Sequence, residues 1–296
     1  MSINYGLDLK KEETDRSPED WVLGATSKSC LVEVPAEDRD KYLPVGEVQK
    51  GKEDFMDCAS RSVINILEFK LNYVYRNDLQ PMLKKWLEDN GYVNENGFVE
   101  LSDRFVAMKS GTSRTGNSLK APCDAAHSWG VIPKAMLPAN KNMTWAEYHE
   151  VSDITVDMDK LGMEFIKRFK INYNIVLSTD FSDLLLIEPI DVGGYAWKFP
   201  NEEGVYQRNE KTFNHAFMIF GKPDFRIFDN YIDSFDGDWV KQLAGDYNFI
   251  PYGYRIYFSE INSDGVKKNW VEDMWNRIFL AIKSSFIPNN PTSYEK

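Results

Sequence analysis

The chain is poor in the residues on which disulfide scaffolds and metal sites depend, with 3 Cys and 3 His among 296 residues. Cys30, Cys58 and Cys123 are odd in number and widely spaced, which excludes a disulfide framework and predicts reduced thiols. No run approaches the roughly 18 apolar residues of a membrane span. Residues 1–14 are polar and lack the apolar core of a signal peptide. We therefore expect a cytoplasmic protein that is not associated with a membrane.

Positive charge is also scarce. The chain has 35 Lys and Arg against 46 Asp and Glu, a net charge of −11. Sequence-independent binding to phosphates needs clustered Lys and Arg, so we do not expect a nucleic acid as partner. Hydrophobic residues are abundant, at 43% with 14% aromatics. This content excludes a disordered chain and is sufficient for a packed core.

Apolar periodicity in the first half of the chain predicts helices. Apolar residues recur at helical spacing from Val63 to Val74, which predicts a buried helix over 57–76. Similar patterns and end signals predict helices over 79–90, 118–129 and 154–169. We therefore expect a helical lobe over 46–170, preceded by an N-terminal extension over 1–45 in which Ser17 begins a short helix.

After residue 170 the pattern changes to short runs of aromatic and β-branched residues between Gly, Pro and Asp turns. These runs predict antiparallel strands at 191–199, 214–220, 225–229 and 252–258. Residues 171–262 are therefore expected to form a sheet lobe, and the fold class is α+β. A last amphipathic helix is predicted within 263–296. We expect it to dock on the body of the protein, and a protein partner is the alternative.

One set of residues is suited to nucleophilic catalysis. Cys58 begins the longest predicted helix, where the helix N-terminus favours a thiolate. A nucleophilic cysteine needs a base, and His215 begins a predicted strand. A third polar group should orient the imidazole, and Asp229 and Asn230 both follow the next strand. The order Cys, His, then Asn or Asp is that of papain-type acyl transfer.

Two sets of residues could bind a metal ion, but both are weak candidates. Cys123 and His127 are four residues apart on a predicted helix, but the sequence offers no second pair to complete a tetrahedral site. The acidic residues from Asp229 to Asp238 lack the spacing of a calcium loop. We expect neither a metal nor an organic cofactor.

Residues 46–260 resemble the papain-like cysteine peptidase superfamily, as a divergent member. The similar segments occur in the family's order, at 49–51, 57–60, 100–103, 116–118, 214–217, 227–231 and 252–256. Asp57 before Cys58 also resembles the bacteriocin-processing branch. The resemblance implies a helical lobe packed on an antiparallel sheet lobe.

The resemblance also implies roles for single residues. Cys58 would be the nucleophile, His215 the acid and base, and Asn230 the residue that orients the imidazole, with Asp229 as its rival. Gln49 would bind the oxyanion together with the Cys58 amide.

A further three residues of the resembling segments would bind the substrate. Gly116 and Asn117 would pair with an extended peptide, and Asn214 would also bind it. The expected substrate is a peptide or a protein.

Two functions remain open at this point. The first is a thiol peptidase or a related acyl-transfer hydrolase, such as an amidase or a transglutaminase-like enzyme. The alternative is a catalytically inactive papain-fold module for binding or assembly, because the family's Cys-Gly-Ser-Cys-Trp signature is absent. A compact chain of this kind fits a phage or a mobile element.

Overall fold

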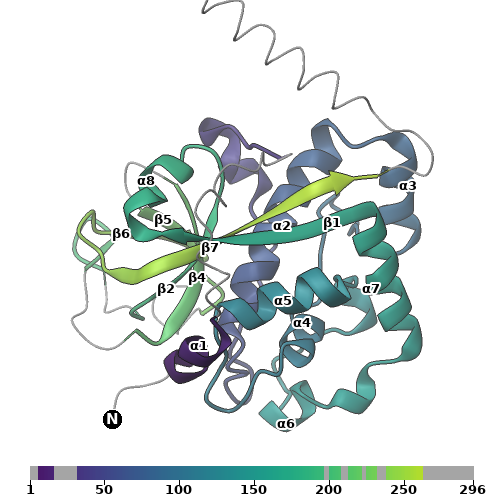
Figure 1. Ribbon diagram of the computed structural model, residues 1–296, viewed down its shortest axis with the longest axis horizontal. Coiled ribbons are helices and arrows are strands. Elements are labelled where there is room, and N and C mark those ends of the chain that lie inside the picture. The colour runs from purple at the N-terminus through teal and green to yellow at the C-terminus, as the bar shows by residue number, and fades with distance from the viewer. Residues whose placement is uncertain are drawn as a thin grey trace, which may run out of the picture. The chain divides into compact units, whose positions relative to one another are not determined.

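A long buried helix and a seven-stranded sheet form the centre of the chain (Figure 1). The computed structural model describes residues 6–16, 32–196, 200–207, 213–221, 225–231 and 238–262. The predicted helix within 263–296, the predicted helix start at Ser17 and the side chain of Cys30 lie outside these residues. Residues up to Ile261 belong to one compact unit.

The predicted helices are confirmed to within a few residues. The α-helices are α1 (Leu9–Asp15), α2 (Cys58–Asn77), α3 (Pro81–Asp89), α4 (Asp103–Lys109), α5 (Lys120–Trp129), α6 (Trp145–Tyr148), α7 (Val156–Arg168) and α8 (Phe181–Leu184). The 3₁₀ helices are η3 (Ala36–Tyr42), η4 (Lys134–Met136), η5 (Val151–Asp153) and η6 (Ser178–Asp180). The sequence does not predict α1 and α4, because helices of 7 residues are too short to establish an apolar repeat.

The strands form one sheet in the order β1-β7-β2-β4-β5-β6-β3. They are β1 (Phe169–Leu177), β2 (Ile190–Gly194), β3 (Val205–Tyr206), β4 (His215–Gly221), β5 (Phe225–Phe228), β6 (Val240–Leu243) and β7 (Phe249–Ile261). The four predicted strands correspond to β2, β4, β5 and β7. β1 begins at Phe169, where the sequence predicts the end of a helix. The sequence does not predict this strand, because Asn172 and Asn174 weaken its strand pattern. β3 pairs with β6 in parallel, and the other pairs are antiparallel.

α2 joins the two halves of the chain. It packs on β2, β4 and β7 on one side and on α4 and α5 on the other, so it is buried nearly all round. In Figure 1 α3, α4, α5, α6 and α7 lie on the side of the molecule away from β5 and β6, whereas α1 lies below β2 and β4. β4 is buried on both faces, with Met218 in the core that contains α2 and Phe217 in a second core behind the sheet.

The fold class is therefore the expected α+β arrangement of helices packed on a mostly antiparallel sheet. Among the described residues, no helix combines the length and the apolar character needed to cross a bilayer.

Candidate active site

Cys58 is the first residue of α2, and its side chain is 1% exposed. The amide of Ala216, next to His215 on β4, donates a hydrogen bond to the sulfur. Met56 precedes the helix with φ of 59°, in the left-handed region that side chains rarely adopt. This turn directs the chain into α2 and leaves the sulfur at the positively polarised end of the helix.

Burial favours the neutral thiol form of Cys58. Burial is the main reason why its pKa lies well above the ordinary value, and the Ala216 amide opposes that increase. Nearby carboxylates add to the increase, in the order Asp57, Asp54 and Asp229. Because a thiolate is the nucleophilic form, the burial of the sulfur works against its reactivity.

His215 begins β4 and faces Asp229, which follows β5. The His215 Nε2 lies 2.7 Å from the Asp229 Oδ1, and both side chains are 1% exposed. The same oxygen accepts a hydrogen bond of 3.1 Å from the amide of Tyr231. With Nε2–H donated to Asp229, the neutral ring carries its lone pair on Nδ1 and can act as a base there.

The expected contact between Asn230 and the imidazole is corrected by these positions. The Asn230 side chain accepts a hydrogen bond from Asn65 of α2 and donates one of 2.9 Å to the Glu47 carbonyl. Neighbouring side chains of an extended segment point to opposite sides. When Asp229 faces His215, Asn230 therefore faces α2. The rival assignment, Asp229, is the one that the hydrogen bond supports.

Gln49 lies in the loop that leads to the Cys58 turn. Its side chain is buried, its amide nitrogen Nε2 donates to Asp54 at 3.1 Å, and its backbone N–H donates to the Asn230 carbonyl at 2.9 Å. Asp54 also accepts a hydrogen bond of 2.8 Å from the Met56 amide. The Asp54 carboxylate thus links Gln49, the predicted oxyanion donor, to the turn before Cys58.

Asp57 is directed away from the sulfur. Its carboxylate accepts hydrogen bonds of 2.9 and 3.0 Å from the Arg61 Nε and one from the Tyr148 hydroxyl. Arg61 also pairs with Asp103 at 3.0 Å. Asp57 therefore takes part in a buried ion-pair network that holds the first turn of α2 against α4.

Residues 6–16, the N-terminal segment, begin directly over Cys58. A Cβ atom added to Gly6 would lie 3.1 Å from the Cys58 Sγ and 2.8 Å from the Met56 carbonyl, and Gly6 has φ of +108°. Only glycine tolerates this conformation and this approach. The next side chain, Leu7, is 3% exposed and packs on Gly193 of β2.

The residues predicted to bind a substrate contact this segment. The Asn117 amide donates to the Gly6 carbonyl at 2.8 Å, and the Asn214 carbonyl accepts from the Leu7 amide at 3.3 Å. A Cβ atom on Gly116 would lie 1.9 Å from the Gly6 oxygen. Gly116, Asn117 and Asn214 are therefore brought together around an extended stretch of the chain itself.

α1 fixes the segment on the helical side, next to α5 (Figure 1). Asp8 caps α1 by accepting from its backbone amides, and the Lys11 Nζ donates to the Ser110 carbonyl at 3.2 Å. The carboxylate of Glu12 accepts a hydrogen bond of 2.6 Å from the Leu119 amide. Residues 6–16 belong to the extension predicted over 1–45, which the sequence indicates as loops that could cover the cleft. Asp8 before α1 is the signal that could have identified the helix within it.

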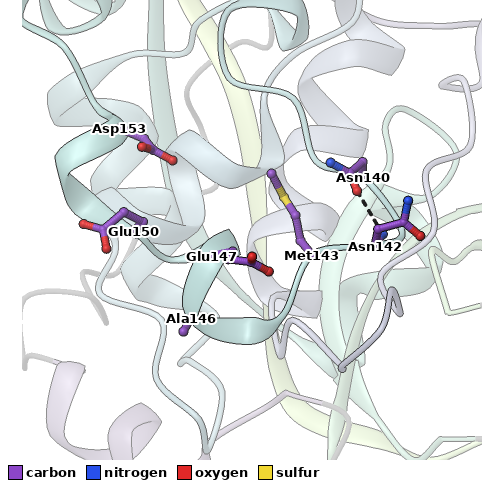
Figure 2. A pocket seen from close by; sticks show the side chains of 7 residues that line it. All are labelled: Asn140, Asn142, Met143, Ala146, Glu147, Glu150 and Asp153. Carbon is purple, nitrogen blue, oxygen red and sulfur yellow. Dashed lines mark hydrogen bonds between the residues drawn. The ribbon is translucent and has the colours of Figure 1, made fainter.

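A hollow elsewhere on the described part of the chain has no Cys, His, Ser or Thr among its lining residues. Figure 2 shows a hollow of about 570 Å³ that is lined by Asn140, Asn142, Met143, Ala146, Glu147, Glu150 and Asp153. Cys123 and His127 bond to the Leu119 and Ile171 carbonyls, respectively. Within the described ranges, no three or more His, Cys, Asp or Glu side chains are grouped to hold a metal ion.

No protein-family model matches the chain, and no curated protein matches its sequence. Solved structures do match. Xylellain, a cysteine protease from Xylella fastidiosa, aligns with a TM-score of 0.53 at 12% identity, over 87% of this chain and 98% of that one. The proform of the ragweed pollen cysteine protease Amb a 11 aligns with a TM-score of 0.51 at 14% identity, over 88% and 76%. The chain therefore has the papain-like cysteine protease fold, as the sequence predicts.

Proposed function

We propose that the protein is a thiol peptidase, or a related acyl-transfer hydrolase, that uses Cys58, His215 and Asp229. The observation that carries this proposal is the 2.7 Å contact between His215 and Asp229, next to the strand residue whose amide contacts the Cys58 sulfur. A nucleophile, a base and a residue that orients the base are the three groups that this kind of acyl transfer uses. The papain-like fold supports a peptidase at the level of the family.

The proposed reaction begins when the thiol of Cys58 transfers its proton to His215. The thiolate attacks the carbonyl carbon of a peptide bond, the C–N bond breaks, and His215 returns the proton to the leaving amine. Water then cleaves the thioester with His215 as base. Asp229 stabilises the imidazolium that forms in both steps.

The oxyanion of the tetrahedral intermediate would form at the N-terminus of α2. The Cys58 amide and the Gln49 side chain are the proposed donors, and each donor of this kind contributes roughly 2.7–4 kcal/mol in comparable enzymes. Gln49 would exchange its bond to Asp54 for a bond to the oxyanion.

The proposed enzyme is closed in this structure. Gly6 lies over the sulfur, and Gly6 and Leu7 use the backbone groups at which an extended substrate would pair. We infer that the segment over 6–16 leaves before a substrate binds. Its departure would also hydrate Cys58 and so reduce the main cause of the raised thiol pKa.

The test is alkylation of the full chain with iodoacetamide across pH, with each cysteine quantified by peptide mass spectrometry. Cys123 is an internal control, because it is also a buried thiol whose pKa is raised by burial. We expect Cys58 to react faster than Cys123 below about pH 7. This advantage should disappear in His215→Gln.

Hydrolysis of an unfolded protein substrate gives the second readout. Wild type should cleave it and Cys58→Ala should not. Equal alkylation of Cys58 and Cys123 at every pH, together with no cleavage, would contradict an enzyme. The inactive binding or assembly module would then be the better explanation, since it would keep its function in Cys58→Ala.

A further inference from the structure

A buried ammonium group lies directly behind Asp229. Lys241 of β6 is 1% exposed, and its Nζ is 3.2 Å from the Asp229 Oδ2. The same Nζ donates to the Asp238 carbonyl at 2.9 Å. Asp229 therefore lies between two basic groups, with His215 on Oδ1 and Lys241 on Oδ2.

The register of the sheet produces this placement. Lys241 pairs with Ile227 across β5 and β6, and directly opposed side chains lie on the same face. Asp229 is two residues beyond Ile227 and so shares that face. Its amide donates to the Trp239 carbonyl at 2.9 Å, which extends the ladder by one pair and brings the long Lys241 side chain within reach.

The charges explain why such a group is needed. A buried carboxylate next to a neutral imidazole would be an uncompensated negative charge, which is costly away from water. Burial alone raises the pKa of Asp229, but the charges of His215 and Lys241 outweigh burial and the net pKa is lowered. When His215 gives up its proton during a reaction, Lys241 is the cation that remains.

We propose that Lys241 is a positioning residue of the active site, which keeps Asp229 ionised and holds its other oxygen toward His215 throughout the reaction. This inference rests on the proposed function, because the orientation of His215 matters for chemistry only if Cys58 reacts.

Several titratable groups share this environment. Asp229 acts electrostatically on Cys58 of α2 and on Tyr247, which follows β6. Asp54 and Asp57 act on Cys58 from the loop before α2. Lys241 is the cation facing Asp229 in this group, so its removal should make proton loss harder at each neighbouring site.

The experiment compares wild type, Lys241→Met and Lys241→Arg in the full chain, by the rate of Cys58 alkylation with iodoacetamide from pH 4 to 10. Lys241→Met should move the profile to higher pH by roughly one unit, the smaller end of the effect of one nearby charge. Lys241→Arg should restore the wild-type profile, because it keeps the charge. Lys70→Met is the matched control, since it removes a buried ammonium from a separate ion pair.

A profile that stays in place in Lys241→Met, with a loss of thermal stability similar to that of Lys70→Met, would overturn the proposal and leave Lys241 a structural role only. If Lys241→Met does not fold, the double variant Asp229→Asn/Lys241→Met tests the coupling between the two side chains. The proposal expects this neutral pair to have a higher Tm than Asp229→Asn alone. An equal or lower Tm would contradict the coupling.

The two hypotheses fail in different ways. If Cys58 is the more reactive thiol and its profile does not move in Lys241→Met, the peptidase proposal stands and the role of Lys241 is rejected. If the profile moves as expected but no substrate is cleaved, Lys241 controls the charge of the site and the proposed function is wrong.

Discussion

Two clusters of buried charge can be compared in this protein. In the first, Glu188 pairs with Lys70 of α2 and Arg255 of β7. In the second, Asp229 lies between His215 of β4 and Lys241 of β6. Each cluster places one buried carboxylate between two basic side chains. The clusters differ in which bases are present and in what lies next to them.

The first cluster is static. A guanidinium group is a fixed cation in proteins, and the Lys70 Nζ donates to the Ile256 carbonyl at 2.6 Å as well. The cluster joins α2 to β7 deep in the protein, and its three side chains are buried. It therefore holds the long helix on the sheet.

The second cluster can exchange a proton. A histidine takes the position that arginine occupies in the first cluster, and an imidazole changes charge near neutral pH. The cluster also adjoins Cys58 at the start of α2. A buried carboxylate that is paired with a histidine beside a thiol, and not with an arginine, therefore belongs to a group suited to acid–base chemistry.

The largest expected effect on stability is in the static cluster. Glu188→Gln removes the carboxylate from between two cations and should cost about 5 kcal/mol in the free energy of unfolding, the upper end for a broken buried pair. Urea unfolding measures this loss. The pH profile of Cys58 alkylation should keep its position in the folded variant. A displaced profile would show that the two clusters are coupled.

Asp229→Asn should cost less, about 3 kcal/mol, because it separates one buried ammonium group, that of Lys241, from its carboxylate, whereas Glu188→Gln separates two cations. The pKa of Asp229 is lowered in the folded state, so its contribution is complete above the unfolded value of about 3.9 and is lost as the pH falls through the folded value. The difference in unfolding free energy between wild type and Asp229→Asn should therefore be full at pH 6 and shrink below about pH 4. A difference that is independent of pH would contradict the ion pair.

Gly6→Ala should open the site. The added Cβ would clash with the Met56 carbonyl and lie close to the Cys58 sulfur, and the left-handed backbone adds about 1–2 kcal/mol. Docking of the segment should weaken, and Cys58 alkylation should accelerate roughly tenfold, which corresponds to about 1.4 kcal/mol. Gly97→Ala is the control, because Gly97 has φ of +75° and no atom within 4 Å of its added Cβ. Equal rates in both variants would show that the segment does not limit access.

The smallest expected effect is at Glu12, which anchors the segment. Burial raises its pKa, although the Leu119 amide and neighbouring Tyr252 and Arg16 oppose the increase. The contribution of Glu12 to docking is therefore complete below its unfolded-state pKa of about 4.3 and is lost as the pH rises through its pKa in the docked state.

Hydrogen exchange over residues 6–16 measures this effect once intrinsic exchange rates are removed. Protection should fall from pH 4 to 7 in wild type, and Glu12→Gln should be insensitive to pH because its amide stays neutral. The same pH dependence in both proteins would assign the change to another group.

Much of the fold could be predicted because it depends on local patterns. The apolar repeat from Val63 to Val74 identifies α2, and the order of helices and short strands predicts the α+β class. Cys58 and His215 stand out because each begins a regular element. β1 and β6 could not be predicted in the same way, since β1 contains two asparagines and β6 is short and partly polar.

The sequence by itself determined the longer helices, four of the strands and which side chains can carry the chemistry, because periodicity, caps and residue types are local properties. Only the tertiary structure decided that Asp229 and not Asn230 faces His215, that Lys241 lies behind Asp229, and that Gly6 covers Cys58. The physical reason is that these contacts depend on strand register and on segments distant in the chain. A shift of one residue in an extended strand reverses which side chain faces the site.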